Sequence, residues 1–175
     1  FRDYGKGMLL SQISPSGKKS PIAKLSGKNA VENLSIGAAE TGAQIIEVEP
    51  GAGWFDIRTD RQGLAILALD GPVHLMGRLG LGTLYFYVPA GVSEFYVQAA
   101  GQGSERVKVS VYDGQGKLFE EKDALCVVHK FIVTRKDPSK GEIWSLKSEK
   151  AADFSLEDFY IDIIGVPPIF ATDKK

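Results

Sequence analysis

Glycine and proline recur along the whole chain and cut it into short pieces. The 175 residues contain 20 glycines and 8 prolines. No stretch between them carries a long hydrophobic period of 3.6 residues with a cap at each end. Short runs bounded by turn residues are typical of β-strands. We therefore expect an all-β protein, with a single helical turn over residues 151–158 as the exception.

The runs that have the length and composition of strands follow one another closely. The expected strands cover residues 22–25, 30–36, 44–48, 54–58, 64–69, 73–76, 83–88, 94–98, 106–112, 127–133, 142–147 and 159–164. One more is expected around 8–13. An Asp-Gly pair at 113–114 follows the run 106–112 and predicts a tight hairpin there.

Alternation within these runs predicts which side chains face the core. Residues two apart in a strand share a face. In the run 83–88, Leu84, Phe86 and Val88 therefore point inward, and Tyr85 and Tyr87 point outward. The valines of the run 106–112 alternate in the same way. Short antiparallel strands with one dry face each favour an antiparallel β-sandwich or a barrel.

The length favours one domain with its own core. A chain of 175 residues should bury roughly 70% of its unfolded surface on folding. We expect a lead-in or linker over residues 1–20, a single β-sandwich domain over 21–170 and a tail over 171–175. The chain opens without an initiator methionine, so we expect a processed or excised piece of a longer protein.

Charge and composition argue against several partners. The formal net charge is −1, so no overall field attracts nucleic acid. No apolar run is long enough to span a membrane. The single cysteine, Cys126, rules out a disulfide within the chain, and we expect it to be a small buried residue.

Two stretches carry a resemblance to known domains. The first comprises an aromatic run with a Val-Pro-Ala-Gly turn (84–91), Phe95-Tyr96-Val97, and a strand ending in Tyr112-Asp113-Gly114. It resembles the bacterial pre-peptidase C-terminal domains. The second joins Ile143-Trp144-Ser145-Leu146 to residues 156–161 and 165–168. It looks like the tail of β-sandwich domains on large secreted bacterial proteins.

The resemblance implies a galactose-binding-like jelly roll that serves as a non-catalytic accessory domain. It also implies a secreted or periplasmic location and a neighbouring hydrolase or protease domain. Domains of this class often hold a structural calcium ion. The acidic pair that the family tends to carry before the Tyr-Asp strand is replaced here by Ser104-Glu105-Arg106. No other cofactor is implied.

The inventory of reactive side chains argues against an enzyme. Hydrolytic catalysis needs a nucleophile, a base and an orienting group in one place. Cys126 and His129 lie three apart in an expected strand, so they should face opposite ways. His74 is interpreted as a half-buried strand histidine. Gly77–Gly82 leads into a strand rather than a helix, so we expect a turn and not a phosphate loop.

Carbohydrate binding is the leading hypothesis. Sugar sites combine a flat aromatic face with donors and acceptors for hydroxyl groups. Trp54, Asp56 and Arg58 share one face of an expected strand, and Tyr85 and Tyr87 supply a second outward pair. These five residues are the candidate ligand-binding site.

The alternative is a structural or protein-interaction sandwich that packs on a neighbouring domain. That function requires a contiguous apolar patch on one face. Phe159, Tyr160 and Ile164 are the candidates for such a patch. For Trp54 itself, packing under a loop or against a neighbouring domain is favoured over ligand binding.

Overall fold

The structure is a computed structural model with two compact units. It describes residues 7–26, 32–37, 39–42, 44–49, 57, 58, 60, 65–67, 71–77 and 81–174. The units are Phe1–Ile57 and Arg58–Lys175. The described residues form strands, turns and bends, and no helix. The helical turn expected at 151–158 is absent because Asp153 has a φ of 63°, which a right-handed helical turn cannot contain.

The first unit is a three-stranded antiparallel sheet. Its order is β2 (Lys19–Leu25), β1 (Met8–Ile13) and β3 (Ile45–Glu49). The strand expected at 8–13 is confirmed. Strand β1 is hydrogen-bonded on both sides, so residues 8–13 of the expected lead-in are the central strand of this sheet. The strand expected at 30–36 is not formed over its described residues, 32–36.

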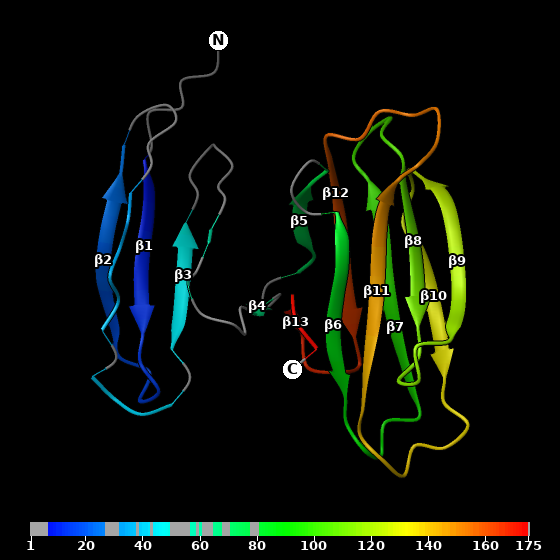
Figure 1. Ribbon diagram of the computed structural model, residues 1–175, viewed down its shortest axis with the longest axis horizontal. Coiled ribbons are helices and arrows are strands. Elements are labelled where there is room, and N and C mark those ends of the chain that lie inside the picture. Colours follow the sequence, from blue (N-terminus) through cyan, green and yellow to red (C-terminus); the bar gives the residue numbers. More distant parts are fainter. Residues whose placement is uncertain are drawn as a thin grey trace. The chain divides into compact units, whose positions relative to one another are not determined.

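The second unit is a sandwich of two antiparallel sheets (Figure 1). One sheet has the order β10-β7-β12-β5, and the other has the order β4-β13-β6-β11-β8-β9. The strands are β4 (Ala65–Leu67), β5 (Val73–Met76), β6 (Gly82–Val88), β7 (Glu94–Gly101), β8 (Val107–Tyr112), β9 (Leu118–Leu125), β10 (His129–Thr134), β11 (Glu142–Lys150), β12 (Asp158–Ile164) and β13 (Ile169–Ala171). The expected all-β antiparallel sandwich is confirmed.

The order of the strands is that of a jelly roll. From β5 to β12, every connection except the β8–β9 hairpin crosses from one sheet to the other. This places β5-β12-β7-β10 against β6-β11-β8-β9, which is the interleaving of a double-sheet jelly roll. β13 and β4 extend the second sheet beyond β6.

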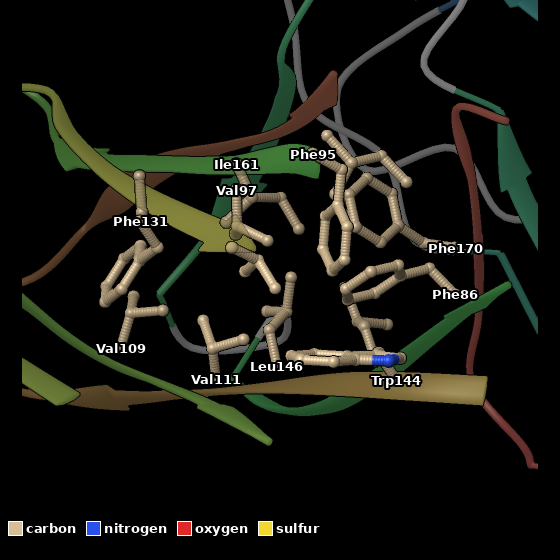
Figure 2. Close-up of a cluster of buried hydrophobic side chains, with 14 of the residues drawn as sticks. Phe86, Phe95, Val97, Val109, Val111, Phe131, Trp144, Leu146, Ile161 and Phe170 are labelled. Carbon is tan, nitrogen blue, oxygen red and sulfur yellow. The ribbon is translucent and has the colours of Figure 1, made fainter. Parts of the chain in front are cut away.

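Both sheets contribute alternate residues to one core. Figure 2 shows Phe95 from β7 among Phe86, Trp144 and Phe170 from the facing sheet. The Phe95 ring meets that of Trp144 at 5.1 Å and 89°, and that of Phe86 at 5.8 Å and 74°. Edge-to-face pairs of this kind stabilise beyond area burial alone. The expected inward residues, among them Leu84, Phe86 and the β8 valines, are buried.

The hairpin expected at Asp113 is confirmed, and the structure extends it into β9. The Asp113 carboxylate accepts hydrogen bonds from the Gln115 and Lys117 amides at 2.9 Å each. Gly116 donates its amide to the Asp113 carbonyl and has a φ of 79°, a conformation that favours glycine. The polar strand β9 was not among the expected strands, because its Glu, Lys and Asp residues give no alternating pattern.

A buried arginine ties the two sheets together at one end of the sandwich. Arg135 follows β10 and donates to the Pro89 and Val92 carbonyls at 3.1 and 3.0 Å, and to the Lys140 carbonyl at 2.5 Å. Its guanidinium also lies 3.3 Å from Glu142 at the start of β11. A buried charge needs such partners to offset its desolvation. Arg135 therefore holds the β6–β7 and β10–β11 connections in one arrangement.

Candidate functional site

The residues of the expected sugar site are only partly described. Trp54 and Asp56 lie outside the described residues, whereas Arg58 is exposed. Tyr85 and Tyr87 lie on the outward side of β6, as predicted, with Tyr85 half-buried and Tyr87 52% exposed. We call the outward side of the six-stranded sheet the ladder face.

The ladder face pairs its charged side chains with one another. Lys147 Nζ lies 2.8 Å from Glu149, and Lys108 Nζ lies 3.0 Å from Glu121. Ser110 donates its hydroxyl to Glu121 at 2.7 Å. That hydrogen bond, together with Lys108, holds the pKa of Glu121 below its ordinary value. The charged side chains that share this face with Tyr85 and Tyr87 are therefore already paired.

The opposite surface of the sandwich carries a hollow. We call the outward side of β10-β7-β12-β5 the hollow face. Strand register places Tyr160 of β12 between His74 of β5 and Ala100 of β7. The next row places Asp162 beside Gln98. A hollow of about 250 Å³ opens over these rows, and its lining includes Pro72, Gln98, Ala100, Val128, Tyr160 and Asp162.

The shape of the hollow follows from residue size along one row. Ala100 is the small residue between two larger ones, because Tyr160 neighbours it on β12 and Val128 precedes β10 on the other side. Adjacent strands lie about 4.8 Å apart, so Tyr160 and Val128 form walls on the two sides of the methyl group. The hollow therefore lies beside the Tyr160 ring, on the side toward Ala100.

Tyr160 is held in place from its other side. The His74 imidazole stacks on its ring with centroids 4.3 Å apart and planes 24° apart. His74 Nε2 lies 3.1 Å from the Asp158 carboxylate. The Gln102 amide, with its nitrogen turned toward them, donates to Asp158 at 3.0 Å and to the Tyr160 hydroxyl at 2.9 Å. We call these four residues the anchor cluster.

His74 takes the half-buried strand position expected from the sequence. Its side chain is 47% exposed, because β5 presents Val73 and Leu75 to the core and His74 falls on the outward side. Its imidazole therefore lies on the outer surface.

Asp162 and Gln98 are the polar residues at one end of the hollow. Both are half-buried. Burial raises the pKa of the Asp162 carboxyl, and a hydrogen bond from the Ile163 amide partly opposes that shift. Across the described part of the chain, no side chain or cation pairs with Asp162, and the side-chain amide of Gln98 has no hydrogen-bond partner. These groups can therefore accept and donate hydrogen bonds to a ligand.

A second aromatic residue lies farther along the hollow face. Tyr96 of β7 neighbours Ile132 of β10 and Ile164 of β12, both of which are exposed. The Lys130 ammonium lies 3.5 Å from the centroid of the Tyr96 ring. The Tyr96 hydroxyl hydrogen-bonds Glu94, and that bond is the main cause of the raised Tyr96 pKa. Lys130 is thus directed toward Tyr96.

The other reactive side chains take structural positions. His129 Nε2 lies 3.3 Å from Glu120, which joins the edge strands β10 and β9 of the two sheets. Cys126 is half-buried rather than fully buried. Among the described residues, no group of three or more His, Cys, Asp or Glu side chains is arranged to hold a metal ion. A calcium ion stays a prediction.

Sequence reasoning singled out Tyr160 but grouped it wrongly. Phe159 is fully buried in the core, whereas Tyr160 and Ile164 lie outside, so the three do not make one patch. Strict alternation along 159–164 would have grouped Tyr160, Asp162 and Ile164. No signal in the sequence pairs Asp162 with Gln98, because that contact depends on strand register.

Comparisons with known proteins yield distant structural similarities. No family model matches the chain, and no curated protein sequence matches it. The C-terminal domain of EclA, a sugar-binding protein, is 15% identical, with a TM-score of 0.28 over 65% of this chain and 84% of that one. A structure of infectious bursal disease virus, Gt strain, is 9% identical, with a TM-score of 0.26 over 97% of this chain and 57% of that one.

No helix that could cross a membrane is found in the described part of the chain.

Proposed function

We propose that this chain is a non-catalytic carbohydrate-binding module that binds its ligand on the hollow face. The observation that carries the proposal is the hollow beside Tyr160, which ends at Asp162 and Gln98. Neither side chain has a side-chain partner among the described residues. An aromatic wall suits the apolar side of a sugar ring, and a carboxylate beside an amide suits its hydroxyl groups.

The size of the hollow suits a single sugar ring. A volume of about 250 Å³ lies below the range of pockets that enclose drug-sized molecules. One sugar ring at a time would enter it, with the rest of a glycan lying along the exposed sheet. Such a shallow site binds weakly, since little surface is buried.

The contacts of the described histidines support a non-catalytic function. His74 faces Asp158, Tyr160 and Gln102, and His129 faces Glu120. In these contacts neither imidazole meets a serine, threonine or cysteine nucleophile. The resemblance to bacterial pre-peptidase C-terminal domains motivates the further proposal that the module belongs to a secreted or periplasmic protein with a catalytic neighbour.

The test compares one aromatic substitution on each candidate surface. Tyr160→Ala should weaken binding to polysaccharide in affinity gels about tenfold, equivalent to roughly 1.4 kcal/mol. Tyr87→Ala removes an exposed tyrosine from the ladder face and should leave binding unchanged. Trp54→Ala tests the site expected from the sequence. Circular dichroism of each variant verifies folding.

If Tyr87→Ala or Trp54→Ala loses binding while Tyr160→Ala does not, the site lies at the residues expected from the sequence and not on the hollow face. If no polysaccharide on a broad glycan array retains the wild-type protein, the proposal fails.

A second candidate function rests on the exposed isoleucines. Ile132 and Ile164 flank Tyr96 on the hollow face, and exposed apolar groups gathered on one face mark protein interfaces. A neighbouring domain could cover this row. Ile132→Asp would then abolish association with that domain while sparing sugar binding at Tyr160.

A further inference from the structure

We infer that the hollow selects an uncharged sugar ring and rejects acidic sugars, with Asp162 as the residue that discriminates. The inference rests on the proposed carbohydrate-binding function and adds the chemical class of the ligand. Three features carry it: the position of Asp162 at the end of the hollow, the charges around it, and the direction of the nearest cation.

The first feature is the position of Asp162. It lines the hollow and lies beside Gln98 in the strand register. The spacing between adjacent strands is about 4.8 Å, so both side chains can reach neighbouring groups on one ring. A carboxylate accepts from two hydroxyls, and an amide both donates and accepts. The pair therefore suits two adjacent sugar hydroxyls.

The second feature is the local charge. Within the described residues, Asp162 has no cationic partner, so its negative charge is uncompensated when ionised. Asp158 adds a second carboxylate on the same strand face, although His74 and Gln102 contact it. A ligand carboxylate or sulfate in the hollow would meet like charge in a partly desolvated site, which disfavours binding.

The third feature is the direction of Lys130. Lys130 neighbours Gln98 in the register and would be the natural partner of an acidic sugar. Its ammonium instead lies 3.5 Å above the Tyr96 ring. Tyr96 is two positions before Gln98 on β7, roughly 7 Å farther along the strand. Lys130 is thus engaged away from the hollow.

The experiment uses each sugar in two matched forms. Neutral hexasaccharides of glucose, mannose and galactose are compared with the same hexasaccharides after oxidation of the C6 hydroxymethyl group to a carboxylate. Isothermal titration at pH 7 with the full chain measures the affinities. We expect at least one neutral form to bind, and its oxidised counterpart to bind at least tenfold more weakly.

Substitution of Asp162 isolates its part in this preference. Asp162→Asn keeps the shape and removes the charge, so neutral binding should fall about tenfold, and the preference over the oxidised form should shrink. Gln98→Ala keeps the charge and should weaken binding while the preference stays. Glu149→Gln removes a charge from the ladder face and should change neither quantity.

Ala100→Leu separates failure of this inference from failure of the proposed function. The larger side chain fills the hollow over Ala100 and should abolish binding of every saccharide. If Ala100→Leu abolishes binding but oxidised and neutral sugars bind the wild-type chain equally, the inferred preference for neutral sugars is wrong. The proposed binding site is then still supported. The discrimination is also overturned if Asp162→Asn leaves the preference unchanged. If Ala100→Leu has no effect, or nothing binds, the proposed function itself is wrong.

Discussion

The two outer faces of the sandwich are built from the same kind of strand, yet they differ in how their polar side chains are satisfied. On the ladder face, Lys108, Ser110 and Glu121 contact one another, and Lys147 contacts Glu149. On the hollow face, Asp162 and Gln98 meet neither an ion-pair partner nor a side-chain donor among the described residues. The charged side chains of the ladder face therefore already pair with one another, whereas Asp162 and Gln98 on the hollow face have no such side-chain partner.

Both faces carry a small residue beside an aromatic one. On the ladder face, Ser145 is the small residue between Tyr85 and Tyr112 in the register, whereas on the hollow face Ala100 occupies the corresponding place beside Tyr160. The hollow of about 250 Å³ includes Ala100 in its lining. Both faces place a small residue next to an aromatic one, so the polar groups without side-chain partners distinguish the candidate site.

The largest expected effect is on the core that carries both faces. Phe95 packs between Trp144 and Phe86 of the facing sheet. Phe95→Ala should lower the free energy of unfolding by about 3–5 kcal/mol, because it leaves a cavity in a close-packed interior. Urea denaturation measures the change. A loss below about 1 kcal/mol would mean that the two sheets do not share one core.

The next effect concerns Arg135, whose contacts link the two sheets. Arg135→Met removes the hydrogen bonds to the Pro89, Val92 and Lys140 carbonyls and leaves Glu142 without its cation. We expect a loss of about 2–3 kcal/mol by the same denaturation assay. Lys136→Met, at the exposed neighbouring position, is the control and should be nearly neutral. Equal effects of the two substitutions would contradict the role of Arg135.

A smaller effect separates positioning from direct binding on the hollow face. His74→Ala removes the ring that stacks on Tyr160, so the dissociation constant for a neutral hexasaccharide should rise roughly threefold. His74→Phe keeps a stacking partner and should restore most of the affinity. Lys147→Ala on the ladder face should leave the affinity unchanged. If His74→Phe binds as weakly as His74→Ala, stacking does not position Tyr160.

The smallest effect is on pH dependence, where the two faces should respond in opposite directions. The pKa of Glu121 lies below its ordinary value of 4.5, so its contribution to stability is present above pH 4.5 and is lost as the pH falls through the lowered value. Glu121→Gln should therefore show a weaker loss of stability in that acidic range. Thermal unfolding between pH 3 and pH 7 measures it.

The pKa shift of Asp162 has the opposite sign to that of Glu121. Its pKa is raised above 3.8, so ionisation destabilises the folded state, and that penalty appears as the pH rises through the raised value. Asp162→Asn should be more stable than the wild type at pH 7, and the difference should vanish below pH 3.8. A difference that persists in acid would show that another property of the substitution is responsible.

The sequence by itself determined the fold class and the division of each strand into inward and outward residues. The alternation of Leu84, Phe86 and Val88 with Tyr85 and Tyr87 predicts their burial, because side-chain direction in a strand depends only on a local period of two. The Asp113 hairpin is equally local. The same alternation, applied along 159–164, separates the outward Tyr160 from the buried Phe159, although our prediction placed both in one patch.

Only the tertiary structure decided which outward residues meet. His74, Tyr160 and Ala100 come from three strands that are far apart in the sequence, and they lie side by side because β5, β12 and β7 pair in one sheet. Strand pairing is a long-range choice, and a shift of one residue would exchange the inner and outer sets. The candidate site depends on that register, so the sequence could supply its residues but not their assembly.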